Sequence, residues 1–229
     1  MTASREFAGF VAAVTADPRV DGLILTGSHA HGFATAHSDY DLLLVAAEGY
    51  ERRRTPTLDV AVYTVEGLAD TTTNPWQRYA FRGARVLLDR LDGRIAELAE
   101  RQATPTPAEA TEWAREGLDG YINFLYRVAK NRRDEDPVAA RLDEAESTSW
   151  LLTTIFALHG RLRPYNKYLR WELETYPLEP PWDASLPDRI AASPASLFPE
   201  VAELARRKGH GDLIDSWGAD IDLIRLILG

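Results

Sequence analysis

The sequence contains no cysteine, and this absence excludes several kinds of chemistry. Disulfides, thiol nucleophiles and zinc–thiolate sites all need cysteine side chains. Lysine is also scarce, with Lys130, Lys167 and Lys208 against many arginines. Lysine and arginine together number 26 against 35 acidic residues, which gives a formal net charge of −9. Because a long nucleic-acid groove needs a surplus of positive charge, we expect no nucleic-acid partner.

Long apolar runs are missing as well. No stretch approaches the roughly 18 uninterrupted apolar residues that indicate a transmembrane helix, so we expect no membrane-spanning segment. The first residues lack the basic start and apolar run of a signal peptide, and we expect a cytoplasmic protein. The composition, 45% hydrophobic and 27% charged over 229 residues, is typical of a globular protein with one large domain or two smaller ones.

The stretch from residue 23 to residue 45 has the most informative pattern in the chain. A first apolar run ends at Gly27 and Ser28, and a second run begins with Asp39 and Asp41. Alternate residues of a strand project from one face, so the two carboxylates would lie side by side and repel each other unless a cation separates them. Oxygen-only ligands favour Mg²⁺ over zinc, and a Gly-Ser turn offers N–H groups and a hydroxyl to a phosphate. This stretch predicts a metal–nucleotide site.

The neighbouring segments predict a strand-rich first domain. We expect a helix over residues 4–16, strands over 22–26, 39–46 and 84–88, and a further strand from Leu58 to Val65. This last strand carries Asp59 near its start, where aspartate is uncommon. The three arginines at residues 52–54 are typical of a solvated loop.

The composition changes at residues 103–107, where Ala-Thr-Pro-Thr-Pro predicts a hinge. We therefore place a domain boundary between residues 104 and 105. Residues 105–229 are predicted to be helical apart from a proline-rich loop over residues 177–187, with the expected helices over residues 108–131, 137–159, 165–174, 194–208 and 212–228. The sequence accordingly favours an α+β fold, a domain with strands followed by an all-helical domain.

The order of these motifs resembles the DNA-polymerase-β-like nucleotidyltransferase superfamily. The matching segments are Leu25-Thr26-Gly27-Ser28, Ser38-Asp39-Tyr40-Asp41-Leu42-Leu43 and Leu58-Asp59-Val60. With its all-helical second half, the chain looks like the small-molecule members, such as aminoglycoside nucleotidyltransferases. The resemblance implies a mixed-sheet domain over residues 1–104 that binds metal and nucleotide. It also implies a helical domain over residues 105–229 that closes the cleft and shapes an acceptor pocket.

The resemblance further implies a role for each motif residue. Asp39, Asp41 and Asp59 would hold two Mg²⁺ ions, while Gly27 and Ser28 would cradle the β- and γ-phosphates of ATP or another nucleoside triphosphate. The implied reaction moves a nucleoside monophosphate, AMP in the first instance, to a hydroxyl of a small molecule and releases pyrophosphate. An aminoglycoside is one candidate acceptor.

Four residues beside the motif allow two interpretations each. Ser38 is typical of a turn residue, and it would also suit a phosphate contact. His29, His31 and His37 are typical of a polar loop, whereas phosphate contact is the alternative because histidine carries charge near neutral pH. Zinc ligation by these histidines is disfavoured, since the aspartates suit a hard ion.

Glu146 is a candidate general base in the helical half. Spacing by three and four residues places it in a partly apolar stripe with Leu142 and Trp150, while Asp143 and Glu144 would point elsewhere. Some aminoglycoside nucleotidyltransferases use a helical-domain glutamate to activate the acceptor hydroxyl, and a partly buried glutamate suits that role. The alternative is a glutamate at the edge of the stripe that pairs with an arginine.

Lys167 is a candidate contact to the triphosphate, since relatives often present a helical-domain lysine to the phosphates. The alternative is a lysine whose stem packs beside an aromatic core formed by its neighbours. Acidic residues that follow, such as Glu172 and Glu179, would attract a polycationic acceptor or simply form a solvated face.

Two rival functions use the same fold. The acceptor would be a protein side chain in an antitoxin-like nucleotidyltransferase, although such chains are usually shorter. A catalytically silent nucleotide-binding protein is the other rival, and the three aspartates argue against it because a silent protein has no need to keep repelling acids together.

Overall fold

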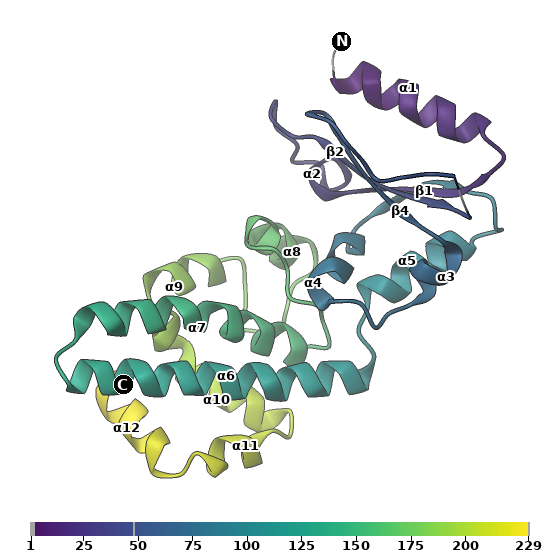
Figure 1. Ribbon diagram of the computed structural model, residues 1–229. Coiled ribbons are helices and arrows are strands. Elements are labelled where there is room, and N and C mark those ends of the chain that lie inside the picture. The colour runs from purple at the N-terminus through teal and green to yellow at the C-terminus, as the bar shows by residue number, and fades with distance from the viewer. Residues whose placement is uncertain (1–2, 48, 229) are drawn as a thin grey trace. The chain divides into compact units, whose positions relative to one another are not determined.

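The computed structural model describes residues 3–47 and 49–228 (Figure 1). The chain forms two compact units, Met1–Thr104 and Pro105–Gly229. The first unit contains a mixed sheet and the second is mostly helical, which confirms the predicted α+β class. Within the described ranges, no helix is long and apolar enough to cross a membrane.

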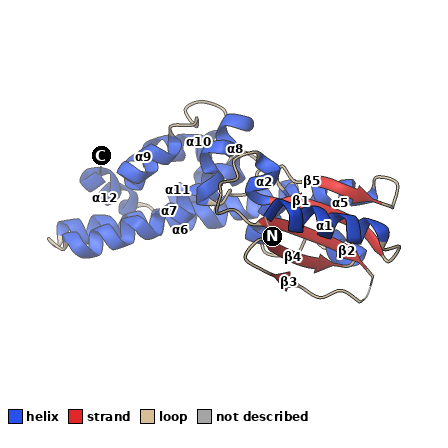
Figure 2. Ribbon diagram, turned by 90° about the horizontal axis from the view of Figure 1, so that it is seen from above, coloured by secondary structure: helices blue, strands red, loops and turns tan. Residues whose placement is uncertain are grey.

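The first unit is built around a five-stranded sheet in the order β3-β4-β2-β1-β5, drawn in red in Figure 2. Strands β2 and β4 are parallel, and the other neighbours are antiparallel. The elements are α1 Ala3–Ala16, β1 Val20–Thr26, α2 Gly27–His31, β2 Tyr40–Ala46, β3 Arg53–Arg54, β4 Leu58–Tyr63, α3 Val65–Ala69, α4 Pro75–Arg78, the 3₁₀ turn Tyr79–Phe81, β5 Arg85–Asp89 and α5 Arg94–Ala103.

Helices cover both faces of this sheet. On one face Leu42 and Leu44 of β2 pack in a core with residues of α1, such as Val14. On the other face Leu43 and Val45 pack in a core with residues of α3 and α5. A central strand covered on both sides needs apolar residues at every position, which explains the uninterrupted apolar run of β2.

The second unit is built around two long helices that lie side by side (Figure 1). The later helices pack on this pair, α12 against α6 and α10 against α7. The elements are α6 Pro107–Arg133, α7 Pro137–Leu158, the 3₁₀ turn Asn166–Tyr168, α8 Leu169–Thr175, α9 Leu186–Ala192, the 3₁₀ turn Pro194–Leu197, α10 Phe198–Arg207, α11 Gly211–Ser216 and α12 Ala219–Leu228.

Local signals explain where the long helices begin and why they lie close together. Thr106 and Glu109 form a capping box at the start of α6, and Asp136 caps α7. A Cβ atom at Gly120 would lie 2.4 Å from the Trp150 ring, so only glycine allows α6 and α7 to approach this closely.

Three sequence expectations about elements were wrong in detail. The arginines expected in a loop form the short edge strand β3, because Arg53 and Arg54 pair with β4. The last helix, expected without interruption over 212–228, is broken into α11 and α12. Gly218 between them has φ +50°, a conformation that ends a helix. Helix α9 begins at Leu186, within the segment expected to be a proline-rich loop up to residue 187.

Candidate functional site

The structure brings Asp41 and Asp59 together on neighbouring strands. They are register partners in the parallel pair β2 and β4, each the second residue of its strand. Both alternate with residues that face α1, so both carboxylates lie on the opposite face of the sheet. Asp39 lies one residue before β2 and makes no hydrogen bond or ion pair with any described residue. Asp41 therefore lies beside Asp59 on the adjacent strand, while Asp39 lies in the segment that leads into β2.

Gly27 and Ser28 open helix α2 directly after β1 ends. Thr26 pairs in register with Asp41, which places the start of α2 beside that carboxylate. A Cβ atom at residue 27 would lie only 2.2 Å from Asp41 Oδ2, and Gly27 also has φ +65°. Glycine is thus required here for conformation and for the close approach of a carboxylate to the backbone. Ser28 is buried beside it.

Asp59 is paired with two arginines that the sequence did not identify as part of the site. Arg52 Nη2 lies 3.3 Å from Asp59 Oδ2, and Arg54 Nε lies 3.7 Å from the same oxygen. Arg54 is the register partner of Asp59 in the β3–β4 hairpin, whereas Arg53 projects from the other face and pairs with Glu6 of α1. The sequence feature that could have predicted this pairing is the run of three arginines at residues 52–54, just before the strand that carries Asp59.

The acids have the kind of side chain that cation sites use. Among the described residues, no three or more His, Asp or Glu side chains are gathered closely enough to make a complete metal site. The donor chemistry nevertheless fits a hard divalent cation, because it consists of carboxylate oxygens alone. The unpartnered Asp39 and the close contact of Asp41 with the Gly27 backbone support this fit. Arg52 and Arg54 supply positive charge to the third carboxylate.

We predict that Gly27→Ala lowers nucleotidyl transfer about 10- to 100-fold, since the new Cβ must displace Asp41 and small displacements of reacting groups are costly. The left-handed backbone should also lower the free energy of unfolding by about 1–2 kcal/mol. Gly32→Ala is the matched control, because Gly32 has φ +81° and no atom within 4 Å of its Cβ position. Assays of activity and urea unfolding should show a stability loss in both variants but an activity loss at residue 27 alone. Equal activity in the two variants would contradict the role of the Gly27–Asp41 contact.

Two of the three histidines beside the motif, His29 and His31, are engaged in contacts within the first unit. The His29 ring stacks on Tyr40 at 3.7 Å between centroids, and Tyr40 packs in the core on the α1 side of the sheet. His31 Nε2 donates to the Arg82 carbonyl oxygen at 2.8 Å, and burial lowers the pKa of this imidazole, which therefore stays neutral near pH 7. His37 is exposed. The structure favours the polar-loop and packing roles for His29 and His31.

The side chain of Ser38 stabilises a turn, which is the first of the two roles considered for this residue. Its Oγ accepts a hydrogen bond from the Thr35 backbone N–H at 2.9 Å. This turn fixes the chain just before Asp39. A phosphate contact by the Ser38 hydroxyl stays a prediction.

The expected position of Glu146 on α7 was wrong. Glu146 is exposed, and Leu142, expected on the same apolar stripe, has 65% of its surface exposed. Asp143, expected to point elsewhere, is buried and pairs with Arg127 at 3.1 Å and Asn131 at 2.7 Å. The reason is that the second half of α7 has apolar residues on all of its sides. The spacing of these residues therefore does not define a single buried face of the helix. The apolar surroundings that would favour Glu146 as a general base are absent.

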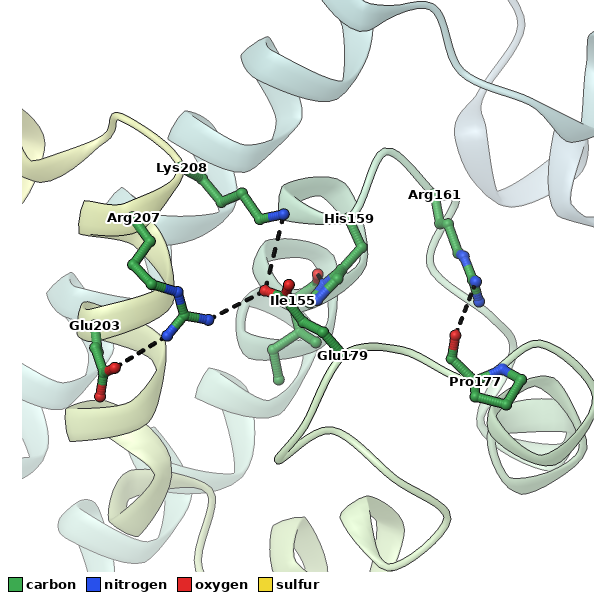
Figure 3. A network of polar contacts seen from close by, with 8 residues as sticks. All are labelled: Ile155, His159, Arg161, Pro177, Glu179, Glu203, Arg207 and Lys208. Carbon is green, nitrogen blue, oxygen red and sulfur yellow. Dashed lines mark hydrogen bonds and ion pairs between the residues drawn. The ribbon is translucent and has the colours of Figure 1, made fainter.

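Lys167 and the acidic residues that follow it lie in the helical unit. Lys167 is exposed, and its Nζ lies 5.7 Å from the centre of the Tyr168 ring. Glu172 is fully buried, with Arg161 Nη1 3.6 Å from its Oε1. Figure 3 shows Glu179 between Arg207 and Lys208, at 3.1 and 3.8 Å. The carboxylates of Glu172 and Glu179 are thus engaged inside this unit, which weakens the idea that they attract a polycation.

The comparison with protein families agrees with this geometry. Residues 10–119 match the model of the nucleotidyltransferase domain, a range that covers the whole sheet and the first turns of α6. No curated protein matches the chain. The matched range includes the Gly27 turn and all three aspartates, in agreement with the resemblance to the DNA-polymerase-β-like superfamily. The chain therefore carries a nucleotidyltransferase domain, and this domain indicates a nucleotidyltransferase.

Proposed function

We propose that the protein is a Mg²⁺-dependent enzyme that transfers a nucleoside monophosphate, AMP from ATP, to a hydroxyl of a small molecule. The observation that carries this proposal is the register pairing of Asp41 and Asp59 beside the Gly27 backbone. Two carboxylates held next to each other attract positive charge, of which Arg52 and Arg54 supply part to Asp59, and Mg²⁺ with a triphosphate is a further partner of the right chemistry. The family of the N-terminal part supplies the reaction class.

In this proposal the three aspartates and the Gly27–Ser28 turn have separate roles. Asp39, Asp41 and Asp59 hold the cation, and the backbone at Gly27 with the Ser28 hydroxyl binds the terminal phosphates. Mg²⁺, when bound, would offset the negative charge of the triphosphate and of the leaving pyrophosphate. The acceptor hydroxyl gives up its proton to a base, for which Glu146 is the candidate, its oxygen bonds to the α-phosphorus, and the bond from that phosphorus to the pyrophosphate oxygen breaks. Position and charge, more than covalent chemistry, make up the contribution of the protein.

The helical unit is proposed to supply the acceptor site. Lys167, exposed and without an ion pair to any described residue, suits a contact with the triphosphate. Glu146 is exposed and stays a candidate base for the acceptor hydroxyl. Since Glu172 and Glu179 are paired within the unit, a neutral or anionic hydroxyl compound suits the chain better than a polycationic aminoglycoside.

A screen of pyrophosphate release tests the proposal. The four nucleoside triphosphates are combined with a panel of hydroxyl acceptors that includes aminoglycosides, with and without Mg²⁺. We expect release that needs both an acceptor and Mg²⁺, with ATP preferred. Release at the same rate when EDTA replaces Mg²⁺ would contradict the metal dependence.

A protein acceptor is the alternative that keeps the same chemistry. Incubation of the enzyme with ATP labelled at the α-phosphate in a cell lysate separates the two cases. A labelled small product supports the proposal, whereas a labelled protein band in place of that product supports the antitoxin-like reading.

The arginines beside Asp59 yield a further prediction about metal affinity. The double variant Arg52→Gln, Arg54→Gln should bind Mg²⁺ about two- to fivefold more tightly, because the guanidinium groups compete with the cation for Asp59. The effect is small because the arginine side chains are 67% and 72% exposed, and such pairs contribute at most about 1 kcal/mol each.

Arg53→Gln is the matched control for this prediction, because Arg53 pairs with Glu6 on the other face of the sheet. Binding of Mn²⁺, followed by electron paramagnetic resonance without any turnover, measures the affinity directly. Tighter binding in the double variant alone is the expected result. Weaker binding in the double variant would mean that the arginines organise Asp59 for the metal instead of competing with it.

A further inference from the structure

A cavity of about 490 Å³ lies in the helical unit between α7, α8 and α9. Its volume falls in the range of about 300–1,000 Å³ that is usual for small-molecule sites. Every residue that lines it belongs to the unit Pro105–Gly229. The cavity can therefore be assessed from the helical unit alone, without reference to the carboxylates of the sheet.

The inner wall of the cavity is apolar. Leu152 of α7, Leu169 of α8 and Ile190 of α9 line it, and these side chains are at most 7% exposed. Ala145 and Pro187 continue the apolar lining. A ligand would gain free energy by removing an apolar group from water into this space.

The polar groups at the cavity offer mainly donors. The Arg141 guanidinium and the Thr148 hydroxyl make no hydrogen bond or ion pair with other described residues. Asn166 Oδ1 accepts a hydrogen bond from Arg163 at 3.2 Å, which leaves the Nδ2 amide hydrogens as donors. Three side chains with donors thus remain available around an apolar space.

The one carboxylate at the cavity is already neutralised. Arg132 Nη2 donates to Glu144 Oε2 at 3.0 Å, and the Ser193 hydroxyl donates to Glu144 Oε1 at 2.5 Å. Glu144 therefore offers little negative charge to a ligand, while the positive charge of Arg141 stays uncompensated by its described neighbours. The charge of the cavity favours an anion over a cation.

We propose that this cavity binds a small organic anion with an apolar body. The apolar part would occupy the space against Leu152 and Ile190, and the carboxylate or similar group would pair with Arg141 and accept hydrogen bonds from Thr148 and Asn166. This site is a binding site of the helical unit and does not depend on nucleotidyl transfer. It is chemically unsuited to a polycation.

Three probes with one apolar body and different charge test the proposal. Phenylbutyrate, phenylbutanol and phenylbutylamine are titrated calorimetrically into the full chain near pH 7. We expect phenylbutyrate to bind about tenfold more tightly than phenylbutanol, and phenylbutylamine to bind most weakly. The free energy of one charge-assisted hydrogen bond corresponds to about this tenfold difference in affinity. Equal affinity for the anion and the amine, or no binding of any probe at millimolar concentration, would overturn the proposal.

Two substitutions at exposed positions locate the binding. Arg141→Gln should lower the affinity for phenylbutyrate about tenfold to the level of phenylbutanol, and it should leave phenylbutanol unaffected. Ala145→Phe, on the exposed side of α7, should fill the cavity and weaken all three probes. Arg5→Gln on α1 is the control for charge, since Arg5 is also an exposed arginine. Unchanged phenylbutyrate affinity in either Arg141→Gln or Ala145→Phe, with circular dichroism showing a folded protein, would place the binding elsewhere and overturn the proposal.

Discussion

Replacement of Asp41 by asparagine is expected to reduce nucleotidyl transfer on the order of 10³-fold. Asparagine keeps the shape of the side chain, so its contact with the Gly27 backbone is retained. It removes the negative charge that the proposed cation requires, and the loss of one group that stabilises transition-state charge typically costs about 10²–10³-fold or more. The rate of pyrophosphate release with a saturating acceptor measures the effect.

Two controls make this result specific. Asp222→Asn removes an aspartate charge from an exposed position on α12 and should leave the rate unchanged. The unfolding midpoint of Asp41→Asn is measured beside the rate, so that loss of the fold is distinguished from loss of the charge. A variant that is folded and retains more than about a tenth of the activity would contradict the role of Asp41.

Replacement of Arg78 by methionine is expected to lower the free energy of unfolding of the first unit by about 3–5 kcal/mol. Arg78 is 1% exposed, and its guanidinium donates to the carbonyl oxygens of Gln102 and Thr104 at 3.0 Å and of Thr71 at 3.1 Å. These groups include the last carbonyls of α5, which have no partner within the helix. Methionine fills much of the space but leaves buried acceptors without donors.

Hydrogen exchange is the measurement for this prediction, because Trp76 is the only tryptophan before residue 105 and fluorescence would report mainly on the helical unit. We expect faster exchange across the strands of the sheet in Arg78→Met and unchanged exchange in α6. Arg94→Met is the control, since Arg94 is an exposed residue at the start of α5 whose ion pair among the described residues is with Glu97 of the same helix. A stability loss no larger than that of Arg94→Met would show that the buried guanidinium is not needed.

The sheet and the acids at the starts of its strands were predictable from sequence, because the apolar patterns that predict strands lie directly beside the acidic residues. The apolar run of β2 directly follows two acids, and strand alternation predicts Asp39 and Asp41 on one face, although β2 itself begins only at Tyr40. The register between Asp41 and Asp59 depends on how β2 and β4 pair, which the sequence does not state but the resemblance implies. The pairing of Asp59 with Arg52 and Arg54 was missed because a two-residue edge strand carries almost no periodic pattern.

The helical half was less predictable for a physical reason. Helix boundaries follow caps, so the starts of α6 and α7 were expected within a residue or so. Which face of α7 is buried depends on three neighbours at once, and its apolar second half has no polar side to orient it. Gly117 and Gly120 of α6 were the better signal, because the closest approach of α7 occurs at the positions where α6 has no side chain.

The position of the radiolabel after turnover tests the central claim most directly. ATP labelled at the α-phosphate and ATP labelled at the γ-phosphate are each incubated with the enzyme, Mg²⁺ and an acceptor identified by the screen. We predict that the α-label moves to the acceptor, that the γ-label appears in pyrophosphate, and that Asp41→Asn lowers both on the order of 10³-fold. Transfer of the γ-label to the acceptor, or α-label transfer in folded Asp41→Asn at more than about a tenth of the rate of the unchanged protein, would contradict this claim.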